Sequence, residues 1–225
     1  MQTPTASELA AYIEHTLLKP EALGRDIDRL CEEAMAHHFF GVCVHGSRVS
    51  RAYSRLEETD VKVVAVVGFP AGACESDVKR YETEVAIDGG ASEIDMVLNT
   101  GQFKDGDHGL TLRELRDVVE AADERPVKLI LETCLLSDEE IVKACQLAEE
   151  AGARFVKTST GFGSAGAKRE HVALMRKTVG DELGVKASGG IRDLAAALAM
   201  IEAGANRIGT SAGVQLMREL SQHAR

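Results

Sequence analysis

Residues 153 to 161 read Ala-Arg-Phe-Val-Lys-Thr-Ser-Thr-Gly, the sixth of eight similar units from which the chain is built. Phe155 and Val156 begin a short apolar strand that runs into Lys157, three hydroxyl side chains and a glycine. A lysine among apolar neighbours loses hydration, which penalises its ammonium form and lowers its pKa. A neutral lysine amine can attack a carbonyl and form a Schiff base. Taken alone, a lysine in this position more often marks the solvated end of a strand.

The same pattern recurs along the chain. Each apolar run of strand length is followed by a segment with helical periodicity, and Gly-Ala pairs that end helices precede three of the runs. The strands are predicted at 13–18, 39–44, 61–67, 93–98, 127–131, 154–157, 185–187 and 207–209. Five helices are predicted at about 25–38, 76–88, 168–179, 193–203 and 213–222. Two more are predicted to begin after caps at Ser47 and Ser137. Another is predicted to follow a loop at 101–109 and to end at about residue 123.

These units predict an α/β protein. Strands that are apolar on both faces need helices on both sides of a parallel sheet. Eight strand-helix units in 225 residues predict a single (β/α)8 TIM barrel domain over residues 1–225, with a short extra N-terminal helix capped by Thr5 or Ser7. A doubly wound open sheet is the alternative, because periodicity does not show whether the sheet closes.

The composition narrows the class of protein. A formal net charge of -10 argues against a nucleic-acid surface, and no apolar run approaches the roughly 18 residues that span a bilayer. The five cysteines form no Cys-x-x-Cys pair, and the N-terminus lacks the pattern of a signal peptide. We therefore expect a cytoplasmic protein that binds neither nucleic acid nor membrane.

Three ionisable residues lie within apolar strands, close to their carboxyl ends: Asp95, Lys157 and Lys186. In a (β/α)8 barrel this end of the strands carries the active site. Strands six and seven are neighbours, so Lys186 should lie near Lys157 and depress its pKa further. The three side chains therefore predict a catalytic site, with a structural Lys-Asp ion pair as the alternative.

Two glycine-rich loops predict a phosphate site. Ser188-Gly189-Gly190 follows the seventh strand and Gly209-Thr210-Ser211 follows the eighth, and each leads into a helix. Backbone N–H groups at such loops and at helix N-termini bind phosphate in many barrels. The alternative is that these glycines only turn the chain.

Other motifs carry less weight. Residues 161–166 match Gly-x-Gly-x-x-Gly, but they belong to the sixth unit and no separate nucleotide-binding half is visible, so no nicotinamide cofactor is expected. His37 and His38 are adjacent, and the other histidines are scattered without the spacing of a metal site. We therefore expect neither a metal nor a cofactor.

The motifs together resemble the deoxyribose-phosphate aldolase family. The matching segments, in chain order, are Glu-His-Thr-Leu-Leu-Lys-Pro from Glu14, Val-Cys-Val around Cys43, Gly-Phe-Pro from Gly68, Glu-Ile-Asp-Met-Val around Asp95, Phe-Val-Lys-Thr-Ser-Thr-Gly-Phe from Phe155, Val-Lys-Ala-Ser-Gly-Gly-Ile-Arg from Val185 and Gly-Ala-Asn-Arg-Ile-Gly-Thr-Ser from Gly204. The resemblance spans nearly the whole chain, and the two lysine motifs are its most specific part.

The resemblance implies a metal-free class I aldolase. It would reversibly cleave 2-deoxyribose 5-phosphate to acetaldehyde and glyceraldehyde 3-phosphate, in deoxyribonucleotide catabolism. Lys157 would form the Schiff base, with Asp95 and Lys186 as the proton relay. It further implies substrate contacts at Glu14, Thr16, Cys43 and Thr160, phosphate contacts at Gly161, Ser188, Gly189, Gly190, Gly209, Thr210 and Ser211, and a homodimer or higher homo-oligomer.

The chain departs from the family at two places. Members usually carry aspartate where this chain has Glu14, which is one methylene longer. Some members end in a tyrosine that reaches the active site, whereas this sequence ends Gln-His-Ala-Arg, so a bound water is expected to replace that group.

Three other functions remain open from the sequence. The first is a Schiff-base aldolase for another phosphosugar. The second is a phosphosugar isomerase or synthase whose lysines act only as cations. The third is a barrel that binds phosphate without catalysis.

Overall fold

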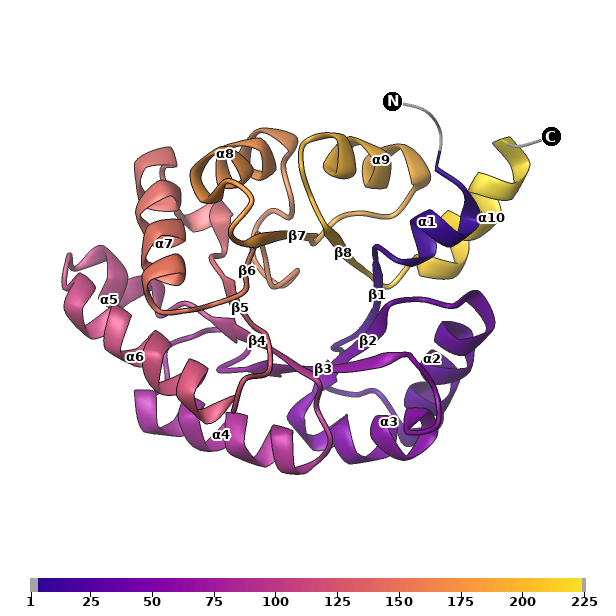
Figure 1. The fold of residues 1–225 in the computed structure, drawn as a ribbon, viewed down its shortest axis with the longest axis horizontal. Coiled ribbons are helices and arrows are strands. Elements are labelled where there is room, and N and C mark those ends of the chain that lie inside the picture. Colours follow the sequence, from indigo (N-terminus) through magenta and orange to yellow (C-terminus); the bar gives the residue numbers. More distant parts are fainter. Residues whose placement is uncertain (1–3, 224–225) are drawn as a thin grey trace.

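Eight parallel strands form a closed barrel in chain order, surrounded by helices (Figure 1). This computed structural model describes residues 4–223, so the expectation about the end of the C-terminal tail lies outside the described residues. The strands are β1 Ile13–Leu17, β2 Gly41–His45, β3 Lys62–Val67, β4 Glu93–Val97, β5 Val127–Ile130, β6 Phe155–Lys157, β7 Gly184–Ser188 and β8 Arg207–Thr210. Pairing of β1 with β8 closes the ring, which confirms the predicted TIM barrel and rules out an open sheet.

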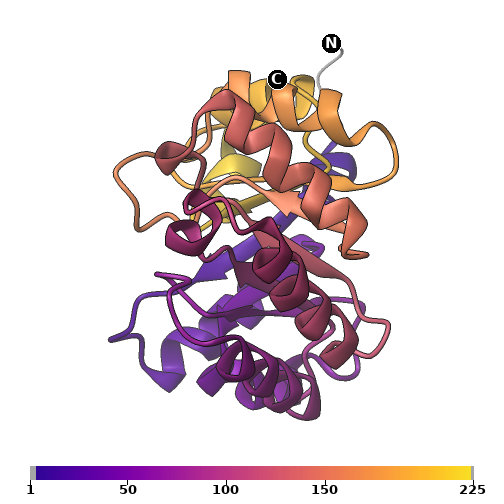
Figure 2. The same cartoon turned by 90° about the vertical axis from the view of Figure 1, so that its left-hand side faces the viewer.

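The helices fill the connections between the strands. The α-helices are α1 Ala6–Ala10, α2 Gly24–His37, α3 Val49–Leu56, α4 Ser76–Asp88, α5 Thr100–Lys104, α6 His108–Ala121, α7 Asp138–Glu150, α8 Arg169–Val179, α9 Leu194–Glu202 and α10 Gly213–His223. Two 3-10 helices, η1 Gly46–Arg48 and η2 Thr133–Leu135, follow β2 and β5. The predicted extra N-terminal helix is α1, whose cap Thr5 accepts a hydrogen bond from the Glu8 backbone N–H. Helix α1 lies beside α10 (Figures 1 and 2).

Two local predictions were wrong. The predicted loop at 101–109 contains helix α5, which begins after Asn99 because the Asn99 side chain accepts a hydrogen bond from the Gln102 backbone N–H. Ser47 does not cap a helix; it lies inside η1, and α3 begins two residues later after Arg48. The Ser137 cap of α7 is confirmed, with a reciprocal capping box to Glu140.

The hydrophobic core lies mainly between the barrel and its helices. The helix-facing residues of the strands, such as Val42, Ala65 and Met96, pack with the inner faces of the helices into one large buried cluster. A second, smaller apolar cluster, which includes Cys43 and Val64, lies apart from this main core. The barrel interior is therefore free to carry polar side chains.

The burial of the cysteines makes a testable prediction. All five are free thiols; Cys31, Cys43 and Cys145 are buried, whereas Cys74 and Cys134 are partly exposed. Burial raises the pKa of Cys31 to about 11 and that of Cys145 to about 12, and it also raises the pKa of Cys43. Because the thiolate is the reactive form, we expect a chromogenic disulfide reagent to titrate two thiols in the native protein and five in denaturant. A third thiol that reacts as fast in the native state would contradict this.

Among residues 4–223, no helix combines the length and the apolar character needed to cross a membrane.

Candidate active site

Asp95 is the centre of a buried charged network inside the barrel. Its Oδ2 accepts hydrogen bonds from Lys157 Nζ at 2.8 Å and from Lys186 Nζ at 2.6 Å. Its Oδ1 accepts a third, at 3.0 Å, from Lys128 Nζ. The Asp95 side chain has no exposed surface, and neither do those of Lys128 and Lys186. The structure thus brings together the three residues that the strand pattern predicted to meet, and it adds Lys128.

Strand register places these side chains on the same side of the sheet. Lys157 of β6 is level with Lys186 of β7, and Asp95 of β4 is level with Lys128 of β5. Residues level with each other on neighbouring parallel strands point to the same face, and residues two apart on one strand share that face. The alternation of side chains along each strand therefore puts both pairs inside the barrel.

Other charged groups extend the network around Asp95. Lys186 also pairs with Glu14 of β1, and Lys128 also pairs with Glu93 of β4. Weaker contacts, at 3.7 Å and 3.9 Å, join Glu14 Oε1 to Lys128 Nζ and to Arg207 Nε. The network contains one more cation than carboxylates: Lys128, Lys157, Lys186 and Arg207 against Glu14, Glu93 and Asp95.

The pKa shifts follow from this arrangement. Burial alone would raise the pKa of Asp95, but Lys128, Lys157 and Lys186 outweigh it and hold that pKa well below its usual range. Burial would lower the pKa of Lys186, yet Asp95 and Glu14 raise it. The pKa of Lys128 is raised in the same way by Asp95, Glu14 and Glu93. Asp95 is therefore a carboxylate, and Lys128 and Lys186 are ammonium ions, at neutral pH.

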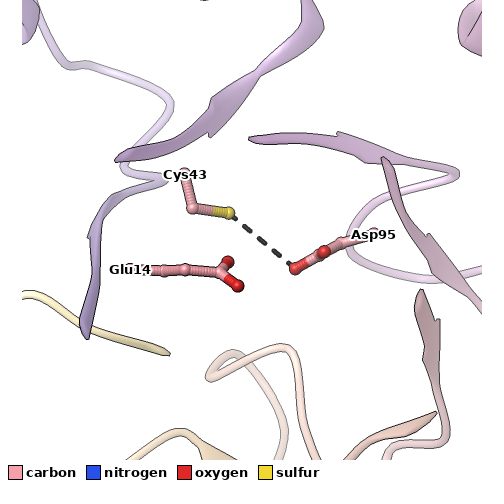
Figure 3. Close-up of side chains that lie close together, drawn as sticks. All are labelled: Glu14, Cys43 and Asp95. Carbon is pink, nitrogen blue, oxygen red and sulfur yellow. Dashed lines mark hydrogen bonds between the residues drawn. The ribbon is translucent and has the colours of Figure 1, made fainter. Parts of the chain in front are cut away.

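Cys43 and Glu14 point toward Asp95 from β2 and β1 (Figure 3). The Cys43 thiol lies 4.0 Å from Asp95 Oδ2, and burial raises its pKa, so it stays protonated. One ligand atom from each of these three residues lies within 4.8 Å of the others, a spacing that a metal ion could use. However, lysine ammonium groups already bind both carboxylates, and their charge disfavours a metal ion here.

A cavity of about 310 Å³ opens above the network at the carboxyl ends of the strands. Its lining includes these residues named by the resemblance: Thr16, Lys157, Thr160, Gly161, Ser188, Gly189, Gly190, Gly209, Thr210 and Ser211. Asp95, Lys186, Glu14 and Cys43 do not line the cavity, because they lie buried beneath it. Lys157 therefore belongs to both the network and the cavity wall.

The charge of the cavity wall favours an anion. Besides Lys157, the lining includes the side chains of Lys19 and Arg192, and it contains no aspartate or glutamate. This local excess of positive charge stands out in a protein whose formal net charge is -10. The sequence analysis gave no role to Lys19 or Arg192, although each lies within a segment that carries the family resemblance.

Two glycine loops meet at the cavity. A Cβ atom on Gly166 would lie 2.1 Å from the Gly189 carbonyl oxygen, so the close contact of the loops requires glycine. The neighbouring Ala167 N–H donates a hydrogen bond to that oxygen at 3.0 Å. Residues 161–166, which resemble a dinucleotide motif, thus pack against the loop after β7, and helix α8 begins only at Arg169.

Glu132 is a further polar residue that the sequence analysis missed. It follows β5, and its carboxylate accepts hydrogen bonds from the hydroxyl and the backbone N–H of Thr160. Glu132 thereby fixes the side chain of Thr160 in the cavity wall. A carboxylate just beyond the carboxyl end of a barrel strand was the signal that could have revealed it.

Comparisons with known proteins agree with this geometry. The sequence profile described as "DeoC/LacD family aldolase" matches residues 9–223. A protein of Streptococcus sanguinis named deoxyribose-phosphate aldolase is 58% identical over 211 residues, which cover 94% of this chain and 96% of that protein.

Solved structures of aldolases are similar to this chain as well. The crystal structure of a putative deoxyribose-phosphate aldolase from Coccidioides immitis has a TM-score of 0.94 and 41% identity, covering 98% of this chain and 88% of that one. A deoxyribose phosphate aldolase from Aeropyrum pernix, whose structure is described as a unique tetramer, has a TM-score of 0.91 and 31% identity, covering 97% and 93%. The profile match and these identities over nearly the full length show that this chain belongs to the DeoC/LacD family of aldolases and is a lyase.

Proposed function

We propose that this chain is a class I aldolase that reversibly cleaves 2-deoxy-D-ribose 5-phosphate to acetaldehyde and D-glyceraldehyde 3-phosphate, through a Schiff base on Lys157. The observation that carries the proposal is the position of Lys157, whose Nζ shares Asp95 Oδ2 with Lys186 at the floor of a cationic cavity. The names of the curated relatives support this substrate.

The covalent step uses the neutral amine of Lys157. Its nitrogen attacks C1 of the open-chain sugar, and loss of water leaves an iminium ion. The bond that breaks joins C2 to C3, because the products have two and three carbons. Its electron pair moves into the iminium and forms an enamine, and hydrolysis of the reprotonated iminium releases acetaldehyde and restores the amine.

Asp95 and Lys186 move the protons. The C3 hydroxyl must lose a proton as the bond breaks, and the enamine carbon must gain one. Asp95 is a buried carboxylate that contacts Lys157, and it can relay both protons through a bound water. Lys186 stays an ammonium ion and orients that water.

The loops after β7 and β8 bind the phosphate group of the substrate. Gly189, Gly190 and Ser211 line the cavity, where their backbone N–H groups would bind the phosphate, and Lys19 and Arg192 add positive charge to its wall. The alternative of a phosphosugar isomerase that uses its lysines only as cations does not require a lysine amine in contact with a buried relay carboxylate.

Arg192 offers a direct test of phosphate capture. We expect Arg192→Gln to raise the KM for deoxyribose 5-phosphate several-fold, with little change in kcat, because an exposed cation near the site attracts the anion. The effect should shrink as salt is added. Arg169→Gln, which removes another exposed arginine outside the cavity, serves as the control, and cleavage of unphosphorylated deoxyribose should not change. A KM unchanged by Arg192→Gln would contradict this role.

Reduction of the Schiff base tests the proposed chemistry. The protein is treated with acetaldehyde and borohydride, digested, and mapped by mass spectrometry. We expect a stable N-ethyl adduct on Lys157, whereas an isomerase would form no adduct. Cleavage assays with deoxyribose 5-phosphate and with other phosphosugars then identify the substrate.

We further propose that the protein acts in the cytoplasm as a homo-oligomer. The five free cysteines support a reducing compartment. The tetrameric relative supports self-association of this barrel.

A further inference from the structure

Glu132 is a buried carboxylate beside the cavity that the proposed reaction does not use. It follows β5 and is only 6% exposed. Its backbone has φ 54° and ψ 62°, a left-handed conformation that costs free energy for a residue with a long side chain. Residues held in such a conformation cluster at functional sites. The strained backbone of Glu132 therefore calls for a function of its side chain.

One oxygen of Glu132 accepts two hydrogen bonds from Thr160. The Thr160 hydroxyl donates to Glu132 Oε2, and the Thr160 backbone N–H donates to the same oxygen at 3.3 Å. Strands β5 and β6 are neighbours in the barrel, so a side chain that follows β5 reaches the loop that follows β6 (Figure 1). A Cβ atom on Gly163 would lie 3.0 Å from Glu132 Cδ, so this loop packs directly against the carboxylate.

These contacts fix the direction of the Thr160 hydroxyl group. A hydroxyl has one proton to donate and two lone pairs that accept, whereas a carboxylate only accepts. The proton of Thr160 Oγ1 therefore lies toward Glu132. The Phe162 backbone N–H donates to Thr160 Oγ1 at 3.0 Å and occupies one lone pair. Because Thr160 lines the cavity, it offers the cavity its second lone pair and no proton.

Glu132 itself lies behind the cavity wall. It lines a smaller cavity of about 210 Å³, whereas Thr160 and Phe162 line both this cavity and the larger one that contains Lys157. Any effect of Glu132 on a substrate bound at Lys157 must therefore pass through Thr160.

We propose that Glu132 is a positioning residue that makes Thr160 an obligate acceptor for the C4 hydroxyl group of the substrate. The inference rests on the proposed cleavage of deoxyribose 5-phosphate. In that reaction the C3 hydroxyl loses its proton to the relay, and the phosphate binds at the loops after β7 and β8. The C4 hydroxyl lies between these two groups and has a proton to donate to Thr160.

The same contact selects the acceptor aldehyde in the direction of synthesis. C4 of the sugar is C2 of glyceraldehyde 3-phosphate, the carbon next to the aldehyde. An aldehyde with a hydroxyl group on this carbon can donate to Thr160. One that carries only an ether or carbonyl oxygen there places two acceptors against each other and is disfavoured. Glu132 thus contributes to specificity from outside the cavity that binds the substrate.

Two sugar phosphates that differ in one hydroxyl group test this role. Glu132→Met removes both carboxylate oxygens but keeps a long, unbranched side chain, so the Thr160 hydroxyl can rotate. We expect Glu132→Met to lower kcat/KM for deoxyribose 5-phosphate about 10-fold. For 2,4-dideoxypentose 5-phosphate, which lacks the C4 hydroxyl, kcat/KM should change by no more than about 2-fold. Release of acetaldehyde is measured for both substrates.

Three further variants separate positioning from a structural role. Glu132→Gln keeps an oxygen that accepts from both Thr160 groups, so it should restore kcat/KM to within about 2-fold of the wild type. Thr160→Val combined with Glu132→Met should be no worse than Thr160→Val alone, because Glu132 acts through that hydroxyl. Glu149→Met, at an exposed position on α7, should behave like the wild type on both substrates. Circular dichroism checks that each variant folds.

Three results would overturn the role of Glu132. The first is a Glu132→Met variant that loses equal activity on both substrates. The second is a Glu132→Gln variant as poor as Glu132→Met, since charge rather than direction would then matter. The third is additive losses in the double variant.

Two other outcomes are also decisive. If Glu132→Met does not fold, Thr160→Val decides, and equal losses on both substrates would again contradict the contact with the C4 hydroxyl. A wild type that cleaves neither sugar would instead overturn the proposed reaction, on which this role rests.

Discussion

Replacing Lys157 with leucine is expected to lower turnover on the order of 10⁶-fold, the scale seen when a covalent nucleophile is removed. Leucine has no amine to attack C1, so neither the iminium nor the enamine can form. The fold should survive, because removing the Lys157 cation leaves the network with equal numbers of cations and carboxylates. A cleavage assay and circular dichroism measure the two parts of this prediction.

Lys177→Leu is the matched control for this substitution. Lys177 lies on α8 and is exposed, so its replacement should leave activity and fold unchanged. A Lys157→Leu variant that keeps more than a trace of activity would contradict covalent catalysis at this position. If that variant also lacked the borohydride adduct, the chemistry would have to be non-covalent.

Asp95→Asn is expected to damage both stability and activity. Asparagine cannot neutralise the three ammonium groups that converge on Asp95, and uncompensated buried charge costs about 3–5 kcal/mol when one partner is removed. Loss of the proton relay should lower turnover by about 10²–10⁴-fold. Urea unfolding followed by circular dichroism gives the free energy of unfolding, and the cleavage assay gives the rate.

The stability effect of Asp95→Asn should depend on pH. The lysines hold the pKa of Asp95 well below its usual range, so its carboxylate contributes fully to the stability of the folded protein above about pH 4. That contribution is lost as the pH falls through the lowered pKa. The difference in the free energy of unfolding between the wild type and Asp95→Asn should therefore become smaller in strong acid. Asp60→Asn, at an exposed position, should have nearly the same free energy of unfolding as the wild type at any pH.

The sequence was sufficient for the repeating units and for part of the site. Charged residues within apolar strands stand out by composition, and the carboxyl ends of the strands of a barrel meet at one active site. That is why Asp95, Lys157 and Lys186 could be placed together before their contacts were known. The glycine loops after β7 and β8 could also be located from the sequence, and both line the cavity; phosphate binding by these loops stays a prediction.

The same reasoning missed Lys128. It lies in the apolar strand Val-Lys-Leu-Ile, just as Asp95 lies in Glu-Ile-Asp-Met-Val, so the signal was present. It lies near the start of its strand, whereas the sequence analysis considered charged residues near the carboxyl ends. The barrel interior is continuous, however, and a long lysine side chain on β5 reaches Asp95.

The face that α4 buries could not be predicted from periodicity. The segment is helical at the predicted bounds, 76–88, but it buries Lys79 and Thr83 while Val78, Tyr81 and Val85 are exposed. The rotation of the helix depends on the buried ion pair between Lys79 and Glu114. This pair joins two helices, so the periodicity of one helix sequence does not reveal it.

The sequence by itself determined the eight strand-helix units, the position of Asp95, Lys157 and Lys186 near the carboxyl ends of their strands, and the family to which the chain is similar. Only the tertiary structure decided that the sheet closes, that Glu14 reaches Lys186 across 172 residues of sequence, and that Lys19 and Arg192 share the cavity with Lys157. The physical reason is that local patterns fix the direction of a side chain relative to its own strand. Closure of β1 onto β8 then sets which distant charges come into contact.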